Sequence, residues 1–179
     1  MQAYFMRHAE TDYNVLQLAN DDPTRNVHLT ATGLHQARAA AEQLKDIPFQ
    51  AMIVSELPRT RHTANIINRC HGVSIRSHPD INDIRTGFDG QPAWKHAAWT
   101  RNDPMYAKAP GGESRHEHRR RVQHFIDWLS RHSYHTVLVV AHEETLRVCL
   151  AQFRHLDDNA MLTTRVDNCQ CFEFTLQRP

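Results

Sequence analysis

The sequence predicts an α/β fold, a three-layer α/β/α sandwich in which helices cover both faces of a mostly parallel central sheet. Three apolar runs, residues 2–6, 51–54 and 136–141, are typical of short strands buried on both faces. Helical patterns separate these runs along the chain. Strands that alternate with helices favour parallel pairing through crossover connections, which is why a layered sheet is expected.

The first half of the chain supplies two units of strand followed by helix. Residues 2–6 form the first strand, and apolar residues recur at near-helical spacing after Thr32, which can cap a helix. Residues 51–54 form the second strand. Pro58 suits the first turn of a helix, which we expect to run toward Gly72.

An irregular segment interrupts this alternation near the middle of the chain. Residues 74–76 are typical of a short strand, whereas residues 80–112 are rich in glycine and proline. We therefore expect a cap or insertion there, with one short helix over 93–99. Ser114 then opens a long helix, because the apolar residues that follow share one helical face.

The C-terminal part returns to the alternating pattern. Residues 136–141 form the strongest strand of the sequence, and a helix is expected over 144–153. Apolar side chains alternate over 169–176, as in a half-buried strand. Because no linker divides the chain, residues 1–179 are expected to form a single domain.

Charge and composition argue against several classes of protein. The formal net charge of +1 lacks the basic excess of nucleic-acid-binding proteins, and the run Arg119–Arg121 is interpreted as the solvated face of a helix. Neither the 4 cysteines nor the 14 histidines show zinc-ligand spacing, so no metal and no cofactor are expected. Without a signal-peptide pattern or a bilayer-length apolar run, we expect a cytoplasmic protein with no membrane partner.

Polar residues follow each of the three buried strands. Arg7 and His8 follow the first, Ser55 and then Arg59 follow the second, and His142 follows the third. The carboxyl ends of parallel strands share one edge of a sheet, so these side chains are expected to converge. Clustered cations repel one another, and a bound anion would neutralise them.

Phosphate is the anion that this set of residues suits. Arginine donates two parallel hydrogen bonds to phosphate oxygens and stays charged at neutral pH. A neutral imidazole is a competent nucleophile toward phosphorus when a backbone carbonyl fixes its second nitrogen. The cluster therefore indicates phosphoryl transfer, with preorganised positive charge lowering the barrier.

The motif around His8 resembles that of the histidine phosphatase superfamily, the family of cofactor-dependent phosphoglycerate mutases and many small phosphatases. The sequence RHAET from Arg7 to Thr11, followed by Asn14, is similar to the family pattern RHGET, with Ala9 in place of glycine. Further landmarks follow in the family's order: Leu29-Thr30-x-x-Gly33-x-x-Gln36-Ala37, Ser55-x-Leu57-x-Arg59-x-x-x-Thr63-Ala64, Gly111-Gly112-Glu113-Ser114 and Ala141-His142.

This resemblance implies a phosphoglycerate mutase-like fold and a role for each matching residue. His8 would be the nucleophile that becomes phosphorylated. Arg7, Arg59 and His142 would hold the phosphoryl oxygens, with Asn14 as a further donor.

The general acid has two candidates. A leaving alkoxide needs a proton, which a carboxyl group with a raised pKa can supply. The family's glutamate corresponds to Asp83, which is one methylene shorter. Glu143 directly follows His142, where a distant acid-phosphatase branch carries its proton donor; alternatively, Glu143 only favours the helix N-terminus.

These observations predict a metal-independent phosphomonoester hydrolase that acts on a small phosphorylated metabolite and also binds inorganic phosphate. One alternative is a phosphotransferase of the phosphoglycerate mutase type. Another, motivated by Ala9, Asp83 and Glu143, is a catalytically weak protein that binds a phosphorylated ligand or a protein phosphohistidine.

Substrate specificity is expected to depend on the irregular segment. Its residues from Arg85 to Lys108 are predicted to cover the pocket. The aromatic and basic side chains in question are Trp94, Trp99, Tyr106, Arg101 and Lys108.

Overall fold

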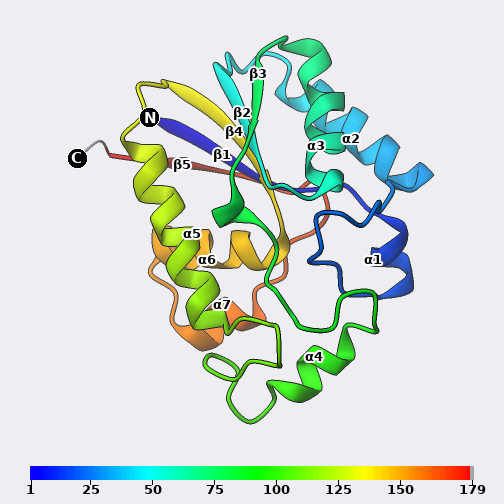
Figure 1. The fold of residues 1–179 in the computed structure, drawn as a ribbon. Coiled ribbons are helices and arrows are strands. Elements are labelled where there is room, and N and C mark those ends of the chain that lie inside the picture. Colours follow the sequence, from blue (N-terminus) through cyan, green and yellow to red (C-terminus); the bar gives the residue numbers. More distant parts are fainter. Residues whose placement is uncertain (178–179) are drawn as a thin grey trace.

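A computed structural model describes residues 1–177 and places a five-stranded sheet between two layers of helices (Figure 1). The strands lie in the order β3-β2-β4-β1-β5, and β1 to β4 are parallel, whereas β5 pairs antiparallel with β1. This arrangement confirms the predicted α/β class and its mostly parallel sheet. The strands are β1 (Gln2–Arg7), β2 (Ala51–Val54), β3 (Ser74–Ser77), β4 (Thr136–Ala141) and β5 (Cys171–Thr175).

Two groups of helices cover the two faces of the sheet. One face is covered by α2 and α3, the other by α5, α6 and α7, while α1 and α4 lie beyond the edge where the parallel strands end (Figure 1). The α-helices are α1 (Asp12–Leu16), α2 (Ala31–Leu44), α3 (Pro58–Ile67), α4 (Trp94–Trp99), α5 (Arg115–Ser130), α6 (Glu143–Arg154) and α7 (Asp158–Thr163).

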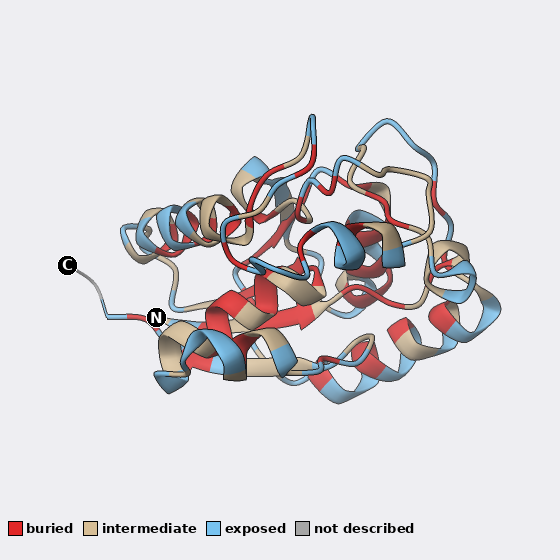
Figure 2. Ribbon diagram, turned by 90° about the horizontal axis from the view of Figure 1, so that it is seen from below, coloured by how far each residue is buried: buried red, intermediate tan, exposed pale blue. Residues whose placement is uncertain are grey.

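Successive residues of the central strands pack into different cores. Phe5 and Val139 join the core under α5 and α6, whereas Met6 and Val140 join the core under α2 and α3. The sheet is therefore buried on both faces, as the dense buried colouring of its strands shows (Figure 2). A sheet covered in this way leaves its edge at the strand ends as the place for a ligand site.

The boundaries of several elements differ from the predicted ones. The cap of α2 is Thr30, whose hydroxyl accepts a hydrogen bond from the Gly33 amide at 2.9 Å, so the expected Thr32 cap is wrong by two positions. Helix α3 ends at Ile67, where a 3₁₀ turn over Asn68–Cys70 replaces the expected continuation toward Gly72. Ser114 caps α5 as predicted.

Helices α1 and α7, which are 5 and 6 residues long, were not predicted, because no periodic apolar pattern marks them in the sequence. Polar caps begin both: Thr11 starts α1, and the Asp157 carboxylate accepts from the Ala160 amide at 2.7 Å before α7. A short helix can therefore depend on its cap more than on an apolar face.

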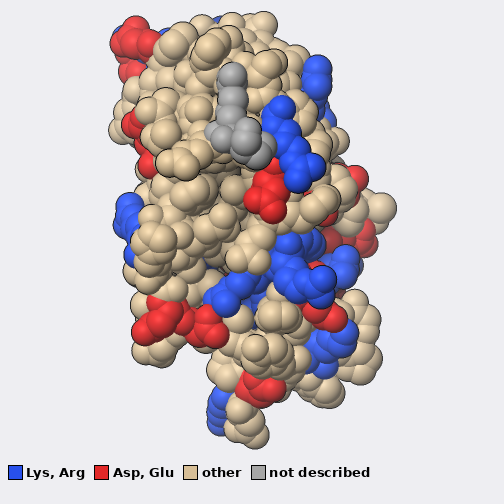
Figure 3. Space-filling model, turned by 90° about the vertical axis from the view of Figure 1, so that its left-hand side faces the viewer, with Lys and Arg blue, Asp and Glu red and all other residues tan. Residues whose placement is uncertain are grey.

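The surface carries charges of both signs. On the face shown in Figure 3, basic side chains gather near the middle with acidic side chains beside them. Within residues 1–177, no helix combines the length and the apolar character needed to cross a lipid bilayer.

Candidate active site

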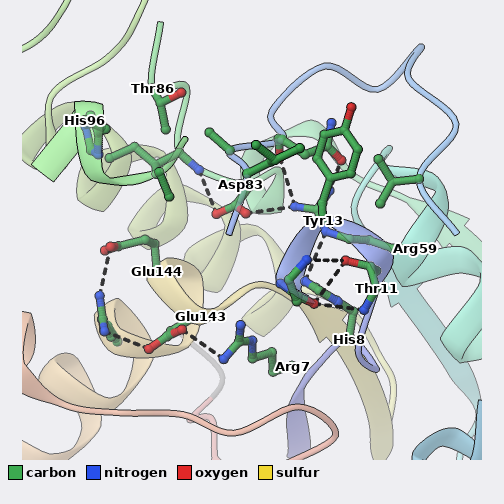
Figure 4. A pocket seen from close by; sticks show the side chains of 18 residues that line it. Arg7, His8, Thr11, Tyr13, Arg59, Asp83, Thr86, His96, Glu143 and Glu144 are labelled. Carbon is green, nitrogen blue, oxygen red and sulfur yellow. Dashed lines mark hydrogen bonds and ion pairs between the residues drawn. The ribbon is translucent and has the colours of Figure 1, made fainter. Parts of the chain in front are cut away.

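The carboxyl ends of three adjacent strands bring the predicted residues together. In the parallel register Arg7 lies opposite Ala141, and Val54 lies opposite Val140, so the residues that follow reach the same edge. The imidazole rings of His8 and His142 have centroids 5.3 Å apart. The convergence expected from the strand ends is therefore present, and Figure 4 shows Arg7, His8 and Arg59 beside one another.

His8 is buried and its ring is fixed at both nitrogens. Nδ1 lies 2.8 Å from the carbonyl oxygen of Ala9, and because a carbonyl only accepts, Nδ1 carries the proton. Nε2 accepts a hydrogen bond from Arg59 Nε at 3.0 Å, so its lone pair faces the guanidinium side of the pocket. Burial and the nearby charges of Arg59 and Arg7 lower the pKa of His8 well below its usual range. The ring is thus neutral at neutral pH, as a nucleophile must be.

Residues outside the pocket hold the loop that carries His8. The Ala9 amide donates to the Thr63 hydroxyl at 3.1 Å, and the Glu10 amide donates to the Gln36 side-chain oxygen at 2.9 Å. A Cβ at Gly33 would lie 2.0 Å from the Glu10 carbonyl oxygen, so only glycine fits there. These contacts explain why this part of the sequence pattern accompanies the nucleophile motif.

Arg59 is buried at the centre of the cluster. From the first turn of α3, its Nη2 reaches His142 Nδ1 at 3.0 Å and Asp83 Oδ2 at 2.8 Å. Nη2 also donates to the Asn20 carbonyl oxygen at 3.0 Å, and Nη1 donates to the Asn20 side-chain oxygen. Burial lowers the pKa of Arg59, and the charge of Asp83 opposes that effect.

Asn20 is a site residue that the sequence analysis missed. It belongs to no recognised pattern and lies 39 residues before Arg59 in the chain. Its side-chain nitrogen also donates to Asp89 Oδ1 at 3.2 Å, so Asn20 connects Arg59 to the irregular segment. Only the fold reveals it.

His142 is fully buried at the N-terminus of α6. Its Nε2 lies 2.8 Å from the Ser55 hydroxyl, and its Nδ1 lies 3.0 Å from Arg59 Nη2. A hydroxyl both donates and accepts, so Ser55 stabilises either neutral form of the ring. Burial and the charge of Arg59 lower the pKa of His142 well below its usual range. Because a guanidinium group only donates, Nδ1 accepts from Arg59 Nη2, and the neutral ring carries its proton on Nε2, facing Ser55.

Asp83 reaches the cluster although it is shorter than glutamate. Its Oδ2 lies 3.5 Å from His142 Nδ1 as well as beside Arg59, and its Oδ1 accepts from the Ile84 amide at 3.0 Å. Burial raises the pKa of Asp83, the charge of Arg59 opposes this, and the charge of Glu144 adds to it. The environment thus favours a carboxyl group that keeps its proton longer than an exposed aspartate.

A buried ion pair holds the backbone at Asp83. Arg121 donates to the carbonyl oxygens of Asp80, Asn82 and Asp83 at 2.8, 2.7 and 2.9 Å. Glu113 is 2% exposed and pairs with Arg121 at 2.5 Å. The interpretation of Arg119–Arg121 as a solvated face is therefore wrong for Arg121, which turns inward to these carbonyls.

Glu143 has different partners. Its Oε2 lies 2.9 Å from Arg7 Nη1, and its Oε1 lies 2.7 Å from Arg147 Nη2. Arg7 also donates to the Val166 carbonyl oxygen at 2.5 Å. Glu143 therefore lines the pocket as a carboxylate shared between two guanidinium groups.

Asn14 lies in the same pocket on α1. Its side-chain oxygen accepts from the Thr11 amide and the Thr11 hydroxyl, both at 3.0 Å. The amide nitrogen of Asn14 is then the group it can offer to a ligand.

The irregular segment does contribute to the pocket, though through other residues than expected. Ile84, Thr86, Ala93 and His96 line it. The predicted aromatic and basic side chains are absent from its described lining, and three of them are largely exposed: Trp94 by 66%, Trp99 by 52% and Tyr106 by 64%. The expectation that they cover the pocket is wrong, because they point to solvent.

Within residues 1–177, no group of three or more His, Cys, Asp or Glu side chains is arranged to hold a metal ion. The pocket is instead a place for an anion, since guanidinium groups and the side-chain amide of Asn14 face one small volume. Such a set matches the needs of phosphoryl transfer.

Comparison with known proteins agrees with this geometry. The family model described as "Histidine phosphatase superfamily (branch 1)" matches residues 3–178. The adenosylcobalamin/alpha-ribazole phosphatase of Escherichia coli is 30% identical over 178 residues, covering 93% of this chain and 86% of that protein. A probable phosphoglycerate mutase GpmB of Enterobacter sp. is 30% identical over 183 residues, covering 94% of this chain and 82% of the relative.

Solved structures show the same fold. The alpha-ribazole phosphatase of Shigella flexneri superposes with a TM-score of 0.84 at 26% identity, covering 94% of this chain and 87% of that one. A mycobacterial glucosyl-3-phosphoglycerate phosphatase, solved in complex with VO3, superposes with a TM-score of 0.81 at 23% identity, covering 97% and 90% of the two chains.

Proposed function

Because the chain belongs to the histidine phosphatase superfamily (branch 1), we propose that it hydrolyses a small phosphorylated metabolite through a phosphohistidine formed on His8. The relatives named as phosphatases of small molecules support the substrate class. One observation carries the mechanism: a neutral His8 whose Nδ1 is tied to a carbonyl and whose Nε2 lone pair faces Arg59.

In the first step, the lone pair of His8 Nε2 forms a bond to phosphorus and the ester P–O bond breaks. Arg7, Arg59, Asn14 and His142 hold the phosphoryl oxygens, and their fixed positions stabilise the charge that moves through the transition state. The electron pair of the broken bond stays on the leaving oxygen. That oxygen takes a proton, and the alcohol departs from phospho-His8.

Asp83 supplies this proton in our proposal. Burial raises the pKa of Asp83, and its Oδ2 lies 2.8 Å from Arg59 Nη2 and 3.5 Å from His142 Nδ1. Glu143 is instead held in ion pairs with Arg7 and Arg147, at 2.9 and 2.7 Å. We therefore assign the acid role to Asp83, and to Glu143 the orientation of Arg7.

In the second step, the Asp83 carboxylate takes a proton from water as the water oxygen attacks phosphorus. The N–P bond breaks, inorganic phosphate leaves, and both neutral His8 and protonated Asp83 are restored. No metal ion takes part in this proposal, because guanidinium groups supply the positive charge.

A mutase is the second candidate, since one relative is named as a probable phosphoglycerate mutase. A mutase returns the phosphoryl group of phospho-His8 to a second hydroxyl of the substrate instead of to water. The same residues serve both reactions, so the fate of the phosphoryl group distinguishes them.

The test is hydrolysis of p-nitrophenyl phosphate in the presence of EDTA. Wild type is expected to release phosphate with EDTA present, and His8→Ala is expected to be inactive. His35→Ala, an exposed histidine on α2, is the matched control and should behave as wild type. Full activity of His8→Ala would overturn the mechanism, and loss of wild-type activity in EDTA would overturn metal independence.

A further inference from the structure

Charged side chains line the pocket in equal numbers of each sign. Among the described lining residues, the basic ones are Arg7, Arg59 and Arg147, and the acidic ones are Asp83, Glu143 and Glu144. His8 and His142 add no charge at neutral pH because burial lowers their pKa values, and burial also lowers the pKa of His96. With Asp83 protonated, as the proposed mechanism requires, three guanidinium groups face two carboxylates, so a bound phosphoryl dianion still leaves the pocket with an excess of negative charge.

Arg147, the basic residue outside the phosphoryl cluster, is already engaged. Its Nε donates to the Thr164 carbonyl oxygen at 2.7 Å, its Nη1 to Glu144 at 2.9 Å and its Nη2 to Glu143 at 2.7 Å. Arg115 lies behind Glu144 at 3.6 Å and is not part of the pocket lining. A second anionic group on the substrate would have to break these pairs and would face two carboxylates.

Other lining residues are apolar. Leu18, Val27, Ile84 and Ala93 are among them, together with the ring of Tyr13. Tyr13 lies across the pocket from Glu143 and Glu144 (Figure 4). These side chains offer contact to an uncharged group, and the cation beside them, Arg25 at 3.5 Å from the Tyr13 hydroxyl, is already paired with Asp89 at 2.6 Å.

We infer that the substrate is a phosphate monoester of an uncharged alcohol, one whose leaving group carries no carboxylate and no second phosphate. The inference rests on the proposed function of the same site. The phosphoryl group occupies Arg7 and Arg59. The carboxylates of Glu143 and Glu144 then disfavour any further negative charge on the substrate, because like charges brought together oppose binding. Glu144 is the specificity residue in this account, since it faces the pocket and shares Arg147 with Glu143.

The experiment compares two compounds that differ only in one charged group. Racemic glycerol 3-phosphate and racemic 3-phosphoglycerate share a skeleton, with a hydroxymethyl group in the first where the second has a carboxylate. Each is used as a competitor of p-nitrophenyl phosphate hydrolysis, so the inhibition constant is measured even if turnover of the competitor is slow. Glycerol 3-phosphate is expected to inhibit at roughly tenfold lower concentration or better.

Glu144→Gln identifies the cause of the discrimination. Removing this carboxylate frees one nitrogen of Arg147 and removes one repulsive charge, so the ratio of the two inhibition constants should narrow by about threefold or more. Glu42→Gln is the matched control, because Glu42 is an exposed carboxylate on α2 far from the pocket lining, and the ratio should stay at its wild-type value.

The outcomes separate this inference from the proposed function. Equal or tighter inhibition by 3-phosphoglycerate, with His8-dependent hydrolysis intact, would overturn the substrate class and leave the mechanism standing. An unchanged ratio of inhibition constants in Glu144→Gln would overturn the role of the Glu144 carboxylate in substrate selection. Hydrolysis of p-nitrophenyl phosphate that persists in His8→Ala would instead contradict the proposed function itself.

Discussion

The floor and the wall of the pocket are held in place by different interactions. The floor, which we define as His8, Arg59 and His142, stands on the ends of paired parallel strands and on the first turn of α3. The wall, defined as residues 80–112, has no strand. The backbone at its proton-donor candidate, Asp83, is held by Arg121, which donates to the carbonyl oxygens of Asp80, Asn82 and Asp83 and pairs with Glu113.

The two regions should therefore tolerate different substitutions. Backbone pairing of the sheet survives a side-chain substitution, so a floor variant should lose chemistry and keep its fold. The wall depends on a buried ion pair, and removing one partner leaves an uncompensated charge. A wall variant should therefore lose both stability and part of the chemistry.

The largest effect is expected from Arg59→Ala. It removes the buried guanidinium that faces His8 Nε2, His142 and Asp83, so kcat/KM for p-nitrophenyl phosphate should fall by about 10³-fold or more. Circular dichroism should still show the wild-type fold. Arg61→Ala, an exposed neighbour on α3, is the control and should keep wild-type activity. A fall in kcat/KM of less than tenfold for Arg59→Ala would contradict the assignment of Arg59 to the catalytic floor.

Asp83→Asn should give the next largest effect, and one that depends on the leaving group. An alkyl ester needs a proton on its leaving oxygen, whereas p-nitrophenolate is a good leaving group without one. We expect kcat for an alkyl phosphate to fall by about 10²-fold and kcat for p-nitrophenyl phosphate to fall much less. Glu143→Gln should affect both substrates to the same degree. The opposite pattern would make Glu143 the acid.

The pH dependence should report the two shifted groups. Because the pKa of His8 is lowered, the neutral nucleophile persists as pH falls, so the acidic limb of kcat/KM should lie below the ordinary histidine value of about 6.5. Because Asp83 acts when protonated, activity on an alkyl ester should decline as pH rises through its raised pKa. Profiles of wild type and Asp83→Asn test this. Persistence of the alkaline limb in the variant would assign it to another group.

Glu113→Gln should have the smallest effect on catalysis and a measurable one on stability. It leaves the partly buried guanidinium of Arg121 beside a neutral partner, which should reduce the free energy of unfolding by about 3 kcal/mol in urea denaturation. Turnover of the alkyl ester should fall more than that of the aryl ester, because the backbone of Asp83 is less well held. Wild-type stability together with wild-type turnover would show that the wall does not depend on this pair.

The floor could be predicted from the sequence because its signal is local. A continuous apolar run followed by Arg7-His8, or by His142, identifies a strand end and the residue that it delivers. Asp83 was found only by its similarity to a family pattern, since no local periodicity surrounds it. The choice between Asp83 and Glu143 then needed their neighbours in space.

What the sequence did not reveal depends on contacts between distant segments. Asn20 supports Arg59 from 39 residues away, and Arg121 reaches the Asp83 carbonyl from 38 residues away. In the sequence, Arg121 belongs to a run of arginines on a helix, where solvent exposure is the ordinary expectation. Only packing against the 80–83 turn gives it an inward role.

The most direct test of the account is to trap the phosphoryl group on His8. Wild-type enzyme mixed rapidly with p-nitrophenyl phosphate and quenched in base should carry one acid-labile phosphoryl group, located on His8 by peptide mass spectrometry, and His35→Ala should carry the same group. A phosphoryl group found on another residue, or steady turnover of enzyme that never becomes phosphorylated during the burst, would contradict the claim that His8 is the nucleophile.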